Sequence, residues 1–70
     1  MKMDGFRRQI QTIEWPVVLR VDGKEIAVDS PEELMVPRAG TLICVYQGGA
    51  FQVIDCKHIS IIRREKSGRS

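Results

Sequence analysis

The sequence has little of what catalysis and metal binding require. It contains a single histidine, His58, and two cysteines, Cys44 and Cys56, among 70 residues. A serine or cysteine nucleophile needs a base and a third group that orients the base, and the sequence offers no recognisable third group. No CxxC or HxxxH pair is present, so a structural zinc site is not expected. We therefore expect no enzymatic activity, no metal, no cofactor and no small-molecule substrate.

Long apolar runs and a targeting signal are also missing. The first ten residues, MKMDGFRRQI, are polar, and every apolar run is far too short to span a bilayer. In the hairpin register given below, Cys44 and Cys56 project from opposite faces, which disfavours a disulfide between them. Two free thiols in apolar surroundings are typical of a reducing compartment. We expect a cytoplasmic protein with no membrane partner.

The chain does contain a clear hairpin between residues 42 and 55. Gly48-Gly49 separates two runs of β-prone residues, and both central residues of a two-residue hairpin turn need positive φ. Side chains alternate along each strand, so the hairpin has two faces. One face carries Leu42, Cys44, Tyr46, Phe51 and Val53, and the other carries Ile43, Val45 and Ile54. Because both are apolar, one must pack on the rest of the chain, and the other needs a second cover from the same chain or another subunit.

The first half of the chain predicts a helix and a second hairpin. Phe6, Ile10 and Ile13 form one helical stripe, and Asp4 is placed to act as the N-cap. After Trp15-Pro16, strands at 17–21 and 24–28 flank an Asp22-Gly23 turn.

A short interruption follows at residues 30–35. Ser30 at the N-cap, Pro31 at the first helical position and Glu33 reaching back to the Ser30 amide predict one helical turn. A last strand, at 59–62, follows the Lys57-His58 pair.

The order of these features resembles the bacterial Sm-like RNA-binding family, the Hfq-like proteins. The shared elements are a helix with basic residues, Pro16-Val17, the Asp22-Gly23 turn, and Lys57-His58 followed by an apolar strand containing Ser60. The family's long second strand is interrupted here by residues 30–40. The aromatic that stacks uracil in the family has no counterpart, and Ile43 lies nearest by position.

The resemblance implies a mainly β fold: a small, strongly bent, five-stranded Sm-like or SH3-like barrel with a short N-terminal α-helix. We expect one domain at residues 1–65 and a disordered tail at 66–70. Copies would assemble into a ring through strand edges, and the ring would bind single-stranded RNA near its pore. By this match Lys57 contacts phosphate, His58 contacts a ribose or base, and Arg7 and Arg8 lie on the ring face or rim.

The charge distribution agrees with binding of a polyanion at the ends of the chain. Residues 1–8 carry a net +2, residues 57–70 a net +4, and the middle a net −4. Arg63 and Arg64 complete the candidate RNA-binding set of Lys57, His58, Arg7 and Arg8.

Two functions therefore stay open. The first is a non-enzymatic, homo-oligomeric Sm-like barrel that binds single-stranded RNA as a riboregulator. The alternative is a small protein–protein interaction module of phage or mobile-element origin with no role in nucleic-acid binding.

Overall fold

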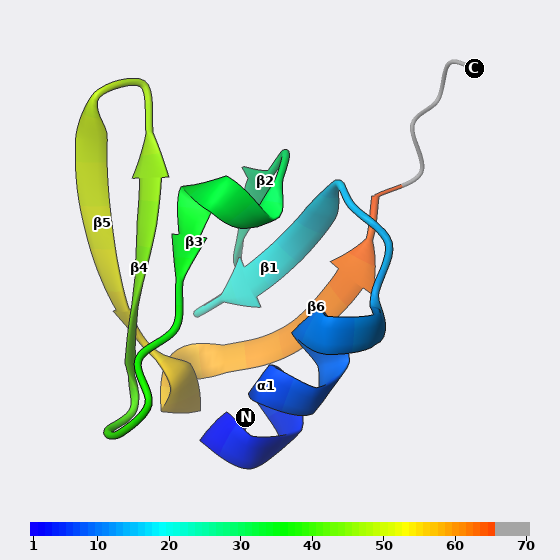
Figure 1. Ribbon diagram of the computed structural model, residues 1–70, viewed down its shortest axis with the longest axis vertical. Coiled ribbons are helices and arrows are strands. Elements are labelled where there is room, and N and C mark those ends of the chain that lie inside the picture. The colour runs from blue at the N-terminus through cyan, green and yellow to red at the C-terminus, as the bar shows by residue number, and fades with distance from the viewer. Residues whose placement is uncertain (66–70) are drawn as a thin grey trace.

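The computed structural model describes residues 1–65, and the tail expected at residues 66–70 lies outside the described residues. The fold is mainly β, with one N-terminal helix and six strands in two antiparallel sheets (Figure 1). The elements are α1 (Met3–Thr12), β1 (Val17–Val21), β2 (Lys24–Val28), η1 (Pro31–Glu33), β3 (Leu34–Met35), β4 (Leu42–Gln47), β5 (Ala50–Asp55), η2 (Cys56–His58) and β6 (Ile59–Arg64).

Each sheet has three strands, ordered β2-β1-β6 in one and β3-β4-β5 in the other. The mainly β class, the N-terminal helix and the helical turn near residue 31 are confirmed. The ladders within residues 1–65 do not close into a barrel. The interruption expected after β2 is present, because Pro31 starts a 3₁₀ turn and cannot donate to a ladder, but the short strand β3 within it was not predicted. β2 therefore ends at Val28, and β3 resumes in the second sheet.

Both predicted hairpin turns are present. Asp22 and Gly23 have φ of 50° and 83°, and Gly48 and Gly49 have φ of 59° and 80°. The β4-β5 register is the expected one, with Ile43 opposite Ile54 and Tyr46 opposite Phe51. Both central residues of each turn lie in the left-handed region, as a two-residue hairpin requires.

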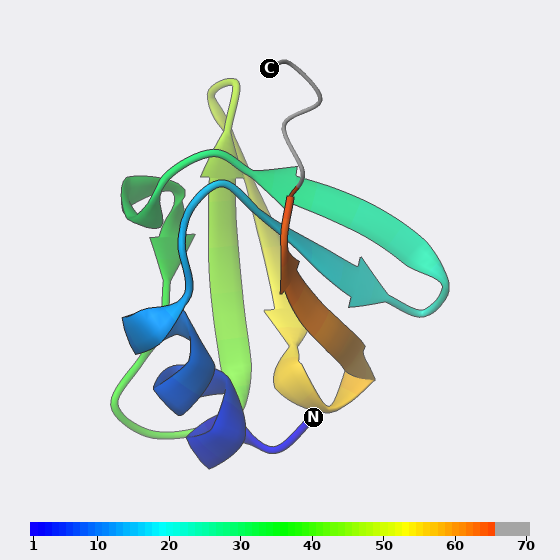
Figure 2. The same cartoon turned by 90° about the vertical axis from the view of Figure 1, so that its right-hand side faces the viewer.

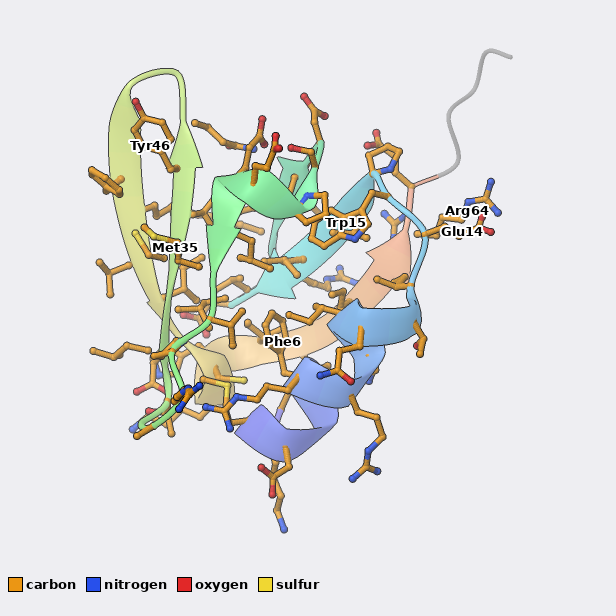
Figure 3. The ribbon with its side chains drawn as sticks, in the orientation of Figure 1. Phe6, Glu14, Trp15, Met35, Tyr46 and Arg64 are labelled. Carbon is orange, nitrogen blue, oxygen red and sulfur yellow. The ribbon has the colours of Figure 1, made fainter. Side chains whose placement is uncertain are left out.

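The core lies between the two sheets and is closed by α1 (Figure 2). Phe6 points from α1 into it and is fully buried (Figure 3). Of the two predicted faces of the β4-β5 hairpin, the one with Ile43, Val45 and Ile54 is buried there, with Ile43 and Val45 at 1% exposure and Ile54 at 5%. Trp15 packs against the edge of the same cluster.

Two local expectations were wrong. The helix starts at Met3 with Lys2 as N-cap, so Asp4 lies inside the first turn, where its charge still suits the helix dipole. The Glu33 carboxylate accepts the backbone N–H of Asp29 at 3.1 Å rather than that of Ser30. Glu33 is the last residue of η1, which is a single 3₁₀ turn. The Glu33 side chain therefore reaches back to Asp29, one residue before the predicted partner Ser30.

The same carboxylate joins the two sheets. The side-chain amide of Gln47, on β4, donates to Glu33 Oε1 at 3.1 Å and also to the carbonyl of Ala27 on β2. The two hydrogen bonds tie the end of β4 to the point where the chain leaves the first sheet.

Candidate nucleic-acid interface

The Lys57-His58 pair lies on η2, the 3₁₀ turn that joins β5 to β6. Cys56 is fully buried and anchors the turn, and its backbone N–H donates to the Thr41 carbonyl at 2.7 Å. Asp55 caps the turn by accepting the backbone N–H of Lys57 at 3.0 Å. With Cys56 held inside, the next two side chains are directed to solvent, with Lys57 74% and His58 49% exposed.

Each of these two side chains faces a carboxylate. His58 Nδ1 lies 3.1 Å from Asp22 Oδ2, which comes from the turn between β1 and β2. Lys57 Nζ lies 4.0 Å from Asp55 Oδ2. Hydrogen bonding from the Lys57 backbone N–H, reinforced by Thr41 and by the nearby positive charges, holds the pKa of Asp55 below its ordinary value of 3.8. Carboxylates therefore offset the positive charge of Lys57 at η2.

The start of the helix lies beside this turn. The amino group of Met1 donates to the carbonyl of Ile59 at 2.8 Å and to that of Cys56 at 3.3 Å. Figure 2 shows the N-terminus next to the coil between β5 and β6. These two hydrogen bonds hold the start of the chain against η2.

Arg7 and Arg8 lie further along α1. The Arg7 guanidinium donates to the carbonyl of Pro37, in the loop after β3. With Arg38, Arg7 lines an open groove of about 350 Å³ between α1 and this loop. Arg38 was missed in the sequence, because only the folded loop brings it beside Arg7. Arg8 is exposed on the helix surface.

Arg63 and Arg64 lie at the far end of β6, five residues beyond the turn. At about 3.3 Å per residue that places them on the order of 17 Å from η2. Arg63 pairs with Glu25 at 3.0 Å, and Arg64 pairs with Glu14 at 2.9 Å. Figure 3 shows the second pair at the edge of the molecule. Lys57 and His58 therefore lie together on η2, whereas the two arginines at the end of β6 lie in separate ion pairs.

Ile43 and Cys56 both point into the core. Ile43, the residue nearest to the stacking position of the Sm-like family, is 1% exposed and cannot stack on a base, in agreement with the missing aromatic. Cys56 and His58 lie on a 3₁₀ turn, with Cys56 inside and His58 outside. Burial raises the pKa of the Cys56 thiol, with smaller opposing and reinforcing effects of the chain amino group and Asp55.

A second candidate surface lies on the outer face of the β3-β4-β5 sheet. We call it the outer sheet face, and it consists of Met35, Leu42, Cys44, Tyr46, Phe51 and Val53. Leu42 and Phe51 are 54% and 64% exposed. The hairpin part of this face was predicted, whereas Met35 joins it only because β3 pairs with β4 opposite Cys44.

Within residues 1–65, no group of three or more His, Cys, Asp or Glu side chains is placed to hold a metal ion. No helix in the same part of the chain combines the length and apolar character needed to cross a bilayer. No protein-family model, no curated protein and no solved structure matches this chain.

Proposed function

We propose that this chain is a non-enzymatic, oligomeric, Sm-like protein that binds single-stranded RNA at the η2 turn. One observation carries the proposal. The turn between the last two strands holds Lys57 and His58 side by side in solvent, fixed from below by buried Cys56 and oriented by Asp55 and Asp22. A lysine offers a point charge to phosphate, and a histidine ring offers a hydrogen bond and a flat face to a ribose or base.

The strand arrangement supports the same proposal. If β2 and β3 are counted as one strand interrupted by η1, the order becomes five strands, β6-β1-β2/β3-β4-β5. That is the number of strands in the Sm-like barrel, which the sequence resembles, with the break at the place where the sequence departs from that family. β5 and β6 each pair on one side only within residues 1–65, so both have an edge to which a neighbouring copy could add.

The carboxylates near the turn set the strength and character of binding. Exposed ion pairs contribute about 0–1 kcal/mol to the stability of the fold. A phosphate can therefore replace Asp55 as the partner of Lys57, or Asp22 as the partner of His58, at little cost. The exposed rings of Tyr46 and Phe51 lie at the opposite end of the hairpin, beyond stacking distance of a base held at η2. Binding should therefore be driven by phosphate contacts, weaken steeply with salt, and distinguish poorly between uridine and adenine.

Fluorescence anisotropy with labelled oligo-U and oligo-A at two salt concentrations tests the proposal. We expect binding at low salt that falls at higher salt, and a smaller salt slope for Lys57→Ala. Arg64→Ala is a matched control, because Arg64 is an exposed basic residue on the order of 17 Å from η2, where it pairs with Glu14. Folded protein that binds neither oligonucleotide at low salt would refute RNA binding, and equal losses for both variants would refute the η2 site.

A second candidate function, a protein-interaction module, is favoured by a different observation. The outer sheet face is apolar and open, which is typical of surfaces that bind protein. One result would distinguish the two candidate functions. Self-association of the protein with no change in the anisotropy of either oligonucleotide would support the interaction module alone.

A further inference from the structure

The outer sheet face has a size and chemistry that a lone small protein rarely leaves open. Five of its six residues are 43–64% exposed. With about 150–250 Å² for an aromatic side chain, the six together leave on the order of 500 Å² of apolar surface. This surface belongs to β3, β4 and β5. Its Leu42 end adjoins η2, since Leu42 lies opposite Asp55, and its groove shares Val36 and Pro37 with the groove that Arg7 lines. None of its six residues belongs to the proposed RNA site.

The face also carries no internal charge conflict. None of its six residues is Asp, Glu, Lys, Arg or His, so a copy of the same face can lie on it without opposing like charges. A charged partner would find no complementary side chain among these six residues. Charge complementarity therefore favours an equally apolar partner, and an identical face meets that condition.

The shape of the face is self-complementary as well. At one end, a groove of about 260 Å³ is lined by residues that include Met35, Leu42, Cys44 and Val53. At the other end, towards the Gly48-Gly49 turn, the rings of Tyr46 and Phe51 pack together with centroids 4.8 Å apart. Figure 3 labels Met35 and Tyr46, which mark these two levels of the sheet.

A two-fold axis near Cys44 would bring these ends together. Side chains two residues apart on one strand face are about 6.8 Å apart. Rotation about an axis at the Cys44–Val53 level therefore places the ring pair of one copy over the groove of the other. Two such faces bury about 1,000 Å² in total, which is the lower limit for a specific protein interface.

We propose that the outer sheet face binds the same face of a second copy of this chain, forming a two-fold, sheet-on-sheet dimer. This inference goes beyond RNA binding and does not rest on it. It is also distinct from ring assembly through the edges of β5 and β6, because side chains and not backbone groups make the contact.

The two cysteines provide a direct test of the geometry. A dimer packed at this level covers Cys44, so a thiol reagent should reach Cys44 more slowly as the protein concentration rises. Cys56 is fully buried and acts as an internal control. We expect labelling of Cys44 in the full-length native protein to slow about tenfold or more between dilute and concentrated solution, and the Cys44→Ser variant to take up almost no reagent under the same conditions.

Charged variants on two surfaces make the test specific. Val53→Lys places a charge in the outer sheet face, whereas Ile61→Lys places the same charge on β6, where Ile61 is 45% exposed. With both variants shown to be folded by circular dichroism, Val53→Lys should weaken association about tenfold or more and abolish the protection of Cys44 at high protein concentration, and Ile61→Lys should not. The proposal is overturned if Cys44 is labelled equally fast at every protein concentration, or if Ile61→Lys and not Val53→Lys removes the dimer.

Discussion

Two neighbouring residues of β4 should respond very differently to the same truncation. Ile43 and Leu42 are adjacent in the chain, but Ile43 is 1% exposed on the inner face, and Leu42 is 54% exposed on the outer sheet face. Truncation of a buried isoleucine to alanine costs about 2–5 kcal/mol, because apolar contact is lost and a cavity remains. Truncation at an exposed site without special contacts changes stability by about 0.5 kcal/mol or less.

The size of the domain sets the design of the experiment. A single core in a chain this short supplies roughly 3–5 kcal/mol, so Ile43→Ala should leave a large unfolded fraction without denaturant. Ile43→Val removes one methyl group at a cost of about 0.5–1.5 kcal/mol and should stay folded. The two Ile43 variants together give a graded series at one buried position, with Leu42→Ala as the matched exposed control.

Urea unfolding, followed by Trp15 fluorescence and far-ultraviolet circular dichroism, measures the free energy of unfolding. The midpoint should fall for Ile43→Val with an unchanged m-value, because the surface exposed on unfolding is nearly the same. The measurement is made at low protein concentration, where single copies dominate. Equal destabilisation by Leu42→Ala and Ile43→Ala in dilute protein would refute the assignment of the two faces.

Protein concentration adds a second readout. Association stabilises the folded state by mass action, so wild-type stability should rise with concentration. Leu42→Ala should lose part of that rise while it matches wild type in dilute solution. If stability does not change with concentration for either protein, the outer sheet face has no self-association to contribute.

Three further predictions concern the inter-sheet contact, the η2 cap and the buried thiol. Gln47→Ala should lower the free energy of unfolding by about 0.5–1.5 kcal/mol, since it removes one of two donors to the partly buried Glu33 carboxylate, and a double-mutant cycle with Glu33→Ala should show coupling by urea unfolding. The lowered pKa of Asp55 stabilises the fold fully above its unfolded-state value of about 3.8, and this contribution is lost as the pH falls through the folded-state value. Thermal unfolding from pH 6 to pH 2 should therefore show a smaller acid-induced loss for Asp55→Asn than for wild type, and equal losses would contradict the role of the Lys57 hydrogen bond. In a variant whose only thiol is Cys56, labelling by a thiol reagent should be slow in native protein and fast in urea, and rapid native labelling would contradict its burial.

Most of the fold could be predicted from local sequence patterns, namely turn residues and the alternation of apolar side chains. Gly48-Gly49 and Asp22-Gly23 set both hairpin registers, because only a few residue types tolerate positive φ at both turn positions. Once the register was known, strict alternation divided the β4-β5 side chains between the two faces, and the buried face is the one with Ile43, Val45 and Ile54.

Contacts between distant segments could not be predicted in the same way. Arg63 and Glu25 are 38 residues apart, and their ion pair depends on how β6 and β2 lie on either side of β1. The β1-β6 ladder also shifts register between Arg20 and Val21, which no local pattern indicates. For the same reason the sequence indicated basic residues at both ends of the chain, but not that Arg63 and Arg64 are already paired with carboxylates.

The split second strand is an intermediate case. The proline at position 31 predicted a turn, but not that the chain would rejoin a different sheet after three residues. That outcome depends on Leu34 pairing opposite Val45, both buried in the shared core.

The mass of the native protein in solution, measured by light scattering over a range of concentrations, shows most directly whether a second copy covers the outer sheet face. We expect an even number of copies at high concentration for the wild type and for Ile61→Lys, and a shift towards half that number for Val53→Lys. A mass of one copy at every concentration would contradict the claim that the outer sheet face is covered by a second copy.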